Sequence, residues 1–319
     1  MVGGIDLGGA KVQAAVLDDD HRPMGEARHP TPTQGGPEAI AEAMAAALEE
    51  AAQSAGVELA KLEGAGACSP GDVDSERGIV ANAHNLVGWG DTSFGLGEDL
   101  ARRLGVRVRV SNDVNAATFG ELRLGAGRPY ESLLGVFWGT GVGGGIVLDG
   151  RIWSGRGAAG EIGHTLVKIG GARCSCGNHG CMEAYAGRGP MEAHARAEHD
   201  KGRKTKLFKL MKERERPRVT SGIWERALDE GDELAAELMK RAVEAVGDGI
   251  GSAVNLLDVQ AVIVGGGMGL RFFERFREDI SKAMHEHLFD RDHPPELHVA
   301  ELGDLGGAIG ASLLLDEDV

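Results

Sequence analysis

This sequence has few basic residues relative to acidic ones, no long apolar run and only four cysteines. Lys and Arg number 34 against 49 Asp and Glu, so the formal net charge is −15 over 319 residues. Binding to nucleic-acid phosphates needs a concentrated positive surface, and we therefore expect no nucleic-acid partner. No uncharged apolar run approaches the roughly 18–20 residues that span a bilayer, so we expect no membrane association.

The first residues, "MVGGIDLGG", contain neither a basic leader nor an apolar signal core. A secretory signal is therefore not expected. A composition of 42% hydrophobic and 26% charged residues is typical of a soluble globular protein, and the length allows two domains. These features predict a cytoplasmic location, where thiols usually stay reduced.

One segment departs from the acidic balance. Residues 200–218, "DKGRKTKLFKLMKERERPR", carry nine Lys and Arg. We interpret the run as a solvated helix face beside a loop, with a patch that steers a phosphorylated ligand as the alternative.

A glycine-broken strand pair occurs twice in the chain. Gly4–Asp18 reads "GIDLGGAKVQAAVLD" and Gly135–Asp149 reads "GVFWGTGVGGGIVLD", with five identities over fifteen positions. The offset is close to half the chain, which favours a duplication that gives two similar α/β lobes. Clustered glycines let backbone N–H groups approach an anion, so a triphosphate is the natural ligand of these turns.

A dinucleotide-binding motif is the rival interpretation of the second turn. "GTGVGG" (139–144) fits the G-x-G-x-x-G pattern, and Glu161 lies about 20 residues on. That motif must open a helix, whereas "GIVLDGRIW" predicts a strand and a turn. Elsewhere the pattern predicts a helix over 37–56, with Pro37 in its first turn and Gly56 at its end. It also predicts a strand that runs into a helix near Asp113, and a strand–glycine–helix unit near 259–288.

Three of the four cysteines fall within eight residues, Cys174, Cys176 and Cys181, with His164 ten positions upstream. The spacing is wrong for a C-x-x-C redox pair, and a disulfide in so short a cytosolic loop is not expected. Three thiolates and one imidazole suit a tetrahedral zinc. Four protein ligands leave no place for a catalytic water, so the zinc is predicted to be structural. His179 is a competing ligand that we expect to lie exposed, and Cys68 is expected to be a core residue.

Two carboxylates flank the predicted zinc ligands. Glu161 precedes His164 by three residues, and Glu183 follows Cys181 by two. Carboxylates and imidazole orient sugar hydroxyls well, so the metal is expected to hold together a sugar-binding surface.

The segments "GIDLGGAK", "NDVNAA", "GTGVGGG", "GEIGH", "CSCGNHGCME" and "VIVGGGMG", in this order, resemble the ROK family of repressors and sugar kinases, and among them most closely the bacterial glucokinases. The resemblance implies an actin-like, hexokinase-type α/β fold of two ribonuclease-H-like lobes with a cleft between them. It places residues 1–111 with 306–319 in a small lobe and residues 112–305 in a large lobe that carries the zinc loop. It also implies a homo-oligomer, either a dimer or a tetramer.

The resemblance implies roles for named residues as well. Asp113 would be the catalytic base, and Asp6 would position Mg²⁺. The sugar ligands would be Gly71, Asn112, Asp113, Glu161, His164 and Glu183. The ATP-binding set would be Asp6, Gly8, Gly9, Lys11, Thr140, Gly141, Gly143, Gly144, Gly265, Gly266 and Gly267.

Asp113 sits where a strand ends and a helix starts, where the helix dipole stabilises a carboxylate. The alternative role for its side chain is the N-cap of that helix. Ala10 is a departure, because the family usually has Thr there, and a hydroxyl that could contact a phosphate oxygen is missing.

The predicted function is ATP-dependent phosphorylation of a hexose, most closely glucose to glucose 6-phosphate. An N-acetylhexosamine or mannose kinase is the main alternative, and ADP or polyphosphate could replace ATP. A non-catalytic sugar-binding protein, suggested by Ala10, is a further one. The family's transcription regulators carry a helix-turn-helix before the first glycine loop, and here the first strand begins at the second residue, so that role is not expected.

Overall fold

The computed structural model describes residues 1–83, 86–90 and 92–315. Contacts divide the chain into two compact units. The first unit comprises Met1–Pro129, Arg151–Ala159 and Glu301–Val319, and the second comprises Tyr130–Gly150 and Gly160–Ala300. The lobes predicted from the sequence change at other residues, 111/112 and 305/306. The helix that starts at Asp113 packs within the first unit, which moves the change of unit to Pro129.

The first unit contains a five-stranded sheet in the order β3-β2-β1-β4-β8 and a three-stranded sheet in the order β5-β6-β7. Its strands are β1 (Val2–Leu7), β2 (Lys11–Leu17), β3 (Pro23–Pro30), β4 (Ala65–Ser69), β5 (Asp72–Asp74), β6 (Ile79–Ala81), β7 (Ser93–Phe94), β8 (Val108–Asn112) and the short β11 (Arg151–Ile152). Its α-helices are α1 (Gly36–Ala55), α2 (Leu96–Leu104), α3 (Asp113–Leu124) and α10 (Gly306–Ser312), and its 3₁₀ turns are Leu59–Lys61, Gly303–Leu305 and Leu313–Leu315.

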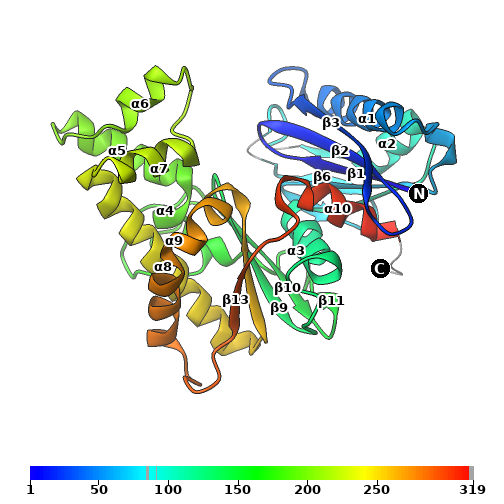
Figure 1. The fold of residues 1–319 in the computed structure, drawn as a ribbon. Helices are drawn as coiled ribbons and strands as arrows, with labels where there is room; N and C mark the ends of the chain where they lie inside the picture. The colour runs from blue at the N-terminus through cyan, green and yellow to red at the C-terminus, as the bar shows by residue number, and fades with distance from the viewer. Residues whose placement is uncertain (84–85, 91, 316–319) are drawn as a thin grey trace. The chain divides into compact units, whose positions relative to one another are not determined.

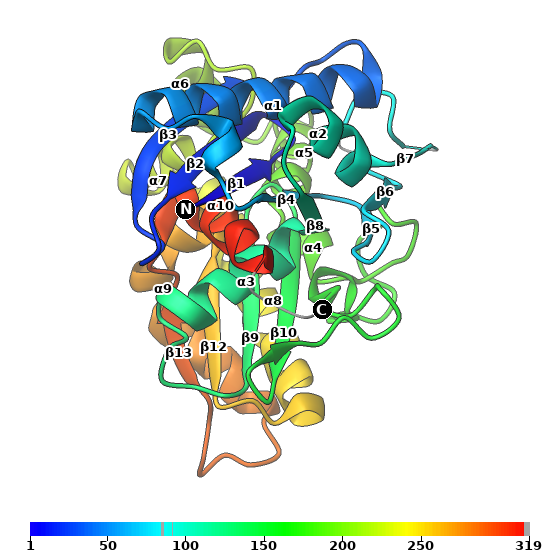
Figure 2. The ribbon, with the colours of Figure 1, turned by 90° about the vertical axis from the view of Figure 1, so that its right-hand side faces the viewer.

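Helices cover the two faces of the five-stranded sheet. α1 and α2 lie on one face, and α10 lies on the other beside α3 (Figures 1 and 2). The inward side of α1 carries Ile40, Met44, Leu48 and Ala51, which recur every three or four residues and are fully buried. Gly56 adopts a left-handed conformation as the C-cap, so the helix ends where the sequence predicts.

Helix α10 contains three glycines in seven residues, which is unfavourable for an isolated helix. Its packing explains them. A Cβ on Gly310 would lie 1.8 Å from the carbonyl oxygen of Ala116 in α3. On the sheet side, a Cβ on Gly66 of β4 would lie 1.7 Å from the carbonyl oxygen of Ala311. The helix backbone therefore lies directly on the sheet and on α3, with no room for side chains between them.

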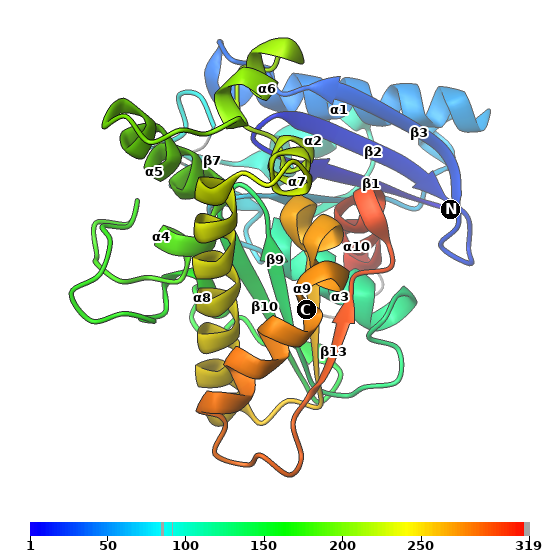
Figure 3. The same ribbon diagram turned by 60° about the vertical axis from the view of Figure 1, so that its left-hand side comes forward.

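The second unit contains the sheet strands β10-β9-β12-β13 in that order, with helices around them (Figure 3). Its strands are β9 (Leu133–Trp138), β10 (Val142–Leu148), β12 (Ala261–Gly265) and β13 (Glu296–Val299). Its α-helices are α4 (Glu183–Ala186), α5 (Arg188–Asp200), α6 (Leu207–Glu213), α7 (Ser221–Asp229), α8 (Glu233–Leu257) and α9 (Gly266–His287), with a 3₁₀ turn at Ile162–His164.

The two sheets repeat one arrangement. β1 pairs with β2 in an antiparallel hairpin and with β4 in parallel, and β9 pairs in the same way with β10 and β12. This is the arrangement that the duplicated hairpin predicts. The glycines of 139–144 lead into strand β10 and not into a helix, so the dinucleotide-binding interpretation is wrong.

The other local predictions agree with the structure. Strand β8 ends at Asn112 and α3 begins at Asp113, and β12 continues through glycines into α9. No helix within the described residues has the length and apolar character needed to cross a membrane.

The contact between α10 and α3 predicts that two glycine-to-alanine changes in α10 differ in their effect on stability. Gly310→Ala should lower the free energy of unfolding by at least about 1–3 kcal/mol, because backbone cannot move away from the new methyl group. The matched control is Gly306→Ala, where the nearest atom to a new Cβ lies at 3.4 Å. It should leave stability unchanged or slightly raised, since alanine favours helices. Chemical denaturation of both variants checks this, and equal stability of the two would contradict the packing argument.

Candidate functional site

Three cysteines and a histidine of the second unit meet in one cluster. One ligand atom from each of His164, Cys174, Cys176 and Cys181 lies within 4.8 Å of the others. His164 Nδ1 is 3.6 Å from Cys174 Sγ, and the Sγ atoms of Cys176 and Cys181 are 3.8 Å apart. Cys174 and Cys181 are buried, His164 is half-buried and Cys176 is exposed. The four residues predicted as zinc ligands are thus brought together.

These distances fit the edges of a zinc tetrahedron. With Zn–S near 2.3 Å and Zn–N near 2.05 Å, a regular tetrahedron places two sulfurs about 3.8 Å apart and a nitrogen and a sulfur about 3.6 Å apart. The observed separations are well above the 2.03–2.05 Å of a disulfide bond, and all four cysteines are free thiols. His179 is exposed and lies outside the cluster, as predicted.

His164 presents its two ring nitrogens to different neighbours. Nδ1 faces the thiols, and Nε2 lies 3.9 Å from a carboxylate oxygen of Glu161. A metal on Nδ1 would fix the proton on Nε2, which then becomes a permanent donor toward Glu161 or toward a ligand hydroxyl.

Glu183 connects the cysteine loop to the second glycine turn. One oxygen of its carboxylate accepts from Ser175 Oγ at 2.9 Å, and the other accepts from the backbone N–H of Val142 at 3.0 Å. Gly141 lies so close that a Cβ there would be 2.3 Å from the carboxylate. The carboxylate is therefore held in place by two loops.

The second glycine turn lies beside the start of α9. Gly139 N–H donates to the carbonyl of Gly141, and a Cβ on Gly139 would lie 4.0 Å from the backbone nitrogen of Gly267. A Cβ on Gly267 would meet no described atom within 4 Å, so the space beside this glycine is open. The predicted phosphate-binding residues Thr140 to Gly144 and the predicted nucleoside-binding residues Gly265 to Gly267 thus border one another.

The first glycine turn lies in the first unit, between β1 and β2. Gly8 N–H donates to the carbonyl of Lys11 at 2.9 Å and closes the turn, which also contains the exposed Gly9. Lys11 Nζ is 3.2 Å from Asp304. Asp6 accepts from the Cys68 thiol at 3.3 Å. Burial raises the pKa of the Asp6 carboxyl, while the hydrogen bond from Cys68 and the charge of Lys11 lower it.

Asn112 and Asp113 divide two tasks at the junction of β8 and α3. Asn112 Oδ1 accepts from the backbone N–H groups of Val114 and Asn115 at 3.0 and 3.2 Å, so Asn112 is the N-cap. Its amide nitrogen donates to the carbonyl of Gly71 at 3.4 Å. Asp113 is the first helical residue and not the cap, so the alternative role considered for it is wrong. Its Oδ1 accepts from Val114 N–H at 3.0 Å.

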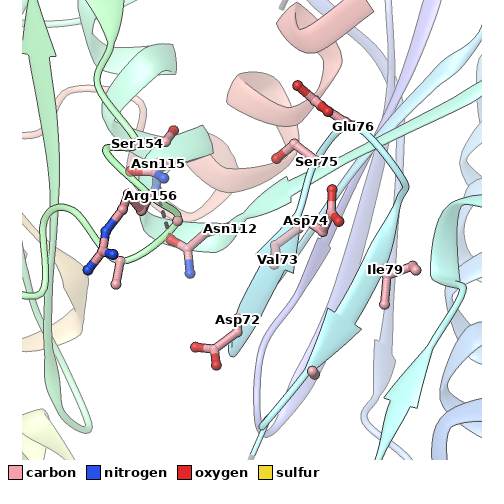
Figure 4. A pocket seen from close by; sticks show the side chains of 13 residues that line it. Asp72, Val73, Asp74, Ser75, Glu76, Ile79, Asn112, Asn115, Ser154 and Arg156 are labelled. Carbon is pink, nitrogen blue, oxygen red and sulfur yellow. Dashed lines mark hydrogen bonds between the residues drawn. The ribbon is translucent and has the colours of Figure 1, made fainter.

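A cavity of about 700 Å³ opens beside this junction within the first unit, a size typical of small-molecule sites (Figure 4). Asn112 and Asn115 line it from the helix start. Opposite them, Asp72 and Asp74 line it from β5. Arg156, from the segment after β11, lines it on the same side as Asn115. Polar groups of both charges thus surround a space large enough for a sugar.

Sequence reasoning missed several polar partners of these residues. Cys68 is a fully buried core residue, as predicted, but no sequence pattern indicated that its thiol also contacts Asp6. Ser175 supports Glu183, and Arg188 donates to Thr140 Oγ1 at 2.7 Å. Only the position of Ser175 inside the cysteine loop gave a signal, because the other two contacts join distant parts of the sequence.

Known proteins resemble the whole chain. The ROK family pattern matches residues 2–318. A glucokinase of Streptomyces coelicolor is 31% identical over 318 residues, which cover 98% of this chain and 97% of the relative. An N-acetyl-D-glucosamine kinase of Histophilus somni is 28% identical over 324 residues, with coverages of 98% and 97%. The crystal structure of a ROK family glucokinase from Streptomyces griseus, in complex with glucose and AMPPNP, is 29% identical, covers 98% of each chain and superposes with a TM-score of 0.79.

The pattern match spans all but the first residue and the last, and the structural likeness extends over both units. The duplicated sheet topology and the cluster of three thiols and an imidazole agree with it. The chain therefore belongs to the ROK family and has its actin-like, hexokinase-type fold.

Proposed function

We propose that this protein transfers the γ-phosphoryl group of ATP to the 6-hydroxyl of a hexose, with glucose as the substrate. The observation that carries the proposal is the full-length similarity to glucokinases, one of them solved with glucose and an ATP analogue. Phosphoryl transfer requires mainly positioning and charge neutralisation, and the described residues offer groups for both.

In this proposal, Asp113 accepts the proton of the sugar hydroxyl as that oxygen attacks the phosphorus. Because Asn112 caps α3, the Asp113 carboxylate is not needed as the cap. Gly71, Asn112, Glu161, His164 and Glu183 would bind the sugar hydroxyls, as the family resemblance implies.

The donor would bind at the glycine turns. Their backbone N–H groups can approach phosphate oxygens, and Asp6 would position Mg²⁺. Mg²⁺ would neutralise charge on the phosphates when bound. The phosphoryl donor is proposed to be ATP. Its proposed binding residues are those that the family resemblance implies: Asp6, Gly8, Gly9, Lys11, Thr140, Gly141, Gly143, Gly144, Gly265, Gly266 and Gly267.

A structural zinc is proposed in the cysteine cluster. His164, Cys174, Cys176 and Cys181 would hold it, and the fit of their separations to a tetrahedron supports this. The metal would fix the Nε2–H tautomer of His164, so that this nitrogen donates to a sugar oxygen. Reduced thiols are needed for this site, which supports the proposed cytoplasmic location. The homo-oligomer that the family resemblance implies stays a prediction.

An N-acetylhexosamine kinase is the second candidate. It is supported by the N-acetyl-D-glucosamine kinase that matches over the same length at nearly the same identity.

A panel of sugars separates the two candidates. We expect kcat/KM with Mg-ATP to be highest for glucose among glucose, mannose, fructose, N-acetylglucosamine and N-acetylmannosamine, measured by coupled assay of ADP release. A preference for an N-acetylated sugar would favour the second candidate. The absence of turnover with every sugar would contradict the kinase proposal.

Asp113→Asn should lower kcat by roughly 10²–10⁴-fold, because the general base is lost. The melting temperature should change little, since the cap is Asn112. The matched comparison is Asn112→Ala, which should lose about 1 kcal/mol of stability with its cap. Steady-state kinetics and thermal unfolding of both variants check this. An Asp113→Asn protein that retains most of its turnover would rule out the base assignment.

Zinc content should depend on the cluster and not on the remaining cysteine. We expect about one zinc per chain by mass spectrometry in the wild type, and far less in Cys181→Ser. The variant should also lose the rise in melting temperature that added zinc produces, because a ligand that binds the folded state stabilises it. The control is Cys68→Ser, which lies outside the cluster and should keep its zinc. Equal zinc in both variants would show that the metal binds elsewhere.

A further inference from the structure

Arg188 is a half-buried cation whose hydrogen-bond acceptors are both neutral. Its guanidinium donates through Nη2 to Thr140 Oγ1 at 2.7 Å and through Nη1 to the carbonyl of Val219 at 3.0 Å. A guanidinium has five N–H donors, so these two bonds leave capacity for more. Taking a charge out of water is costly unless an opposite charge is nearby.

The described surroundings of Arg188 supply little of that opposite charge. No carboxylate of the described chain forms an ion pair with it; Glu192, one turn along α5, acts on it only at longer range. The Glu192 carboxylate itself accepts from Arg196 at 3.0 Å and from Val219 N–H at 2.9 Å. Arg218, from the basic run, adds a second positive charge. Burial above all, and then Arg218, lower the pKa of Arg188, while Glu192 raises it.

The guanidinium is held against the second glycine turn. Arg188 N–H donates to the carbonyl of Gly139 at 3.1 Å, and Gly189 N–H donates to the carbonyl of Thr140 at 2.9 Å. The first residues of α5 are therefore fixed to the turn by backbone as well as by side chain. Helices α5 and α7, which carry or border these residues, lie at the same end of the second unit (Figures 1 and 3).

We propose that Arg188, together with Arg218, binds a phosphate group of the phosphoryl donor at the second glycine turn, beside Thr140. The planar guanidinium matches two oxygens of one phosphate, and the anion supplies the charge that the protein lacks there. The ligand chemistry is a di- or triphosphate chain, which a nucleotide and an inorganic polyphosphate share. This inference rests on the proposed kinase function, because it names the residue that holds the donor. It also gives the basic run of 200–218 a role at its last residue, Arg218.

Binding of Mg-ADP and of inorganic tripolyphosphate, measured by calorimetry without any sugar, tests the proposal. We expect Arg188→Gln to weaken both ligands by roughly ten- to a hundredfold, the usual effect of losing a charge-assisted hydrogen bond. Arg188→Lys should retain part of the affinity. The matched control is Arg241→Gln, an arginine on an exposed face of α8 paired with Glu237, which should stay within about twofold of the wild type. Loss of Mg-ADP affinity alone would assign the site to nucleotides, and loss for both would assign it to the phosphate chain itself.

Salt dependence separates a phosphate contact from a purely structural role. A direct contact predicts a shallower fall of affinity with salt in Arg188→Gln than in the wild type, because one ionic contact is gone. A loosened loop would weaken binding by the same factor at every salt concentration, and that result would overturn the proposal. Mg-ADP and tripolyphosphate affinities equal to those of Arg241→Gln would also overturn it.

Additional variants and sugar-phosphorylation assays distinguish failure of this inference from failure of the kinase proposal. If Arg188→Gln does not fold, as judged by circular dichroism, Arg188→Lys and Arg218→Gln carry the test. Arg218 is exposed and its loss should weaken both ligands by several-fold. If no sugar is phosphorylated but donor affinity still depends on Arg188, the kinase proposal fails and the anion site stands. If sugars are phosphorylated with an unchanged KM for ATP in Arg188→Gln, the function stands and the inference fails.

Discussion

The close approach of the α10 backbone to β1, β4 and α3 is the constraint on which the first unit depends. Glycine and alanine at the contact allow main chain to lie on main chain, so a short helix with poor intrinsic propensity is held by its surroundings. Asp6 lies at the end of β1 against Gly307 of α10, and α3 begins at Asp113. Asp6, proposed to position Mg²⁺, and Asp113, the proposed general base, thus belong to elements whose spacing this contact fixes.

In the second unit, polar side chains add to close backbone packing in holding the loops: a Cβ on Gly180 would lie 1.8 Å from the carbonyl oxygen of Lys168. Glu183 accepts from Val142 and from Ser175, so a single carboxylate ties the second glycine turn to the cysteine loop. The cysteine loop in turn has few buried apolar side chains, and two of those are thiols of the cluster. A metal held by the four ligands would make this loop more rigid, and Glu183, which contacts both segments, would link that constraint to the glycine turn.

The sequence predicts the features that depend on short-range pattern. The duplicated hairpin, the helix that ends at Gly56 and the strand–helix junction at Asp113 all follow from glycines and apolar periodicity. The spacing of the cysteines predicts which side chains converge. The contacts of Cys68 with Asp6 and of Arg188 with Thr140 join residues 62 and 48 positions apart, and no local pattern carries that information. The choice of Asn112 over Asp113 as cap was also open, since both residue types are good caps and only the backbone conformation of Asn112 decides it.

The separation of capping from the neighbouring carboxylate has a consequence for how such a chain can change over evolutionary time. Asn112 caps α3 by accepting from two backbone N–H groups, and Asp113 adds one acceptor for Val114 N–H, so the helix start depends more on residue 112 than on residue 113. The helix start therefore constrains the choice of residue at position 113 less than at position 112. A family member that keeps only ligand recognition could replace this one carboxylate and lose only a minor part of the helix-start interactions.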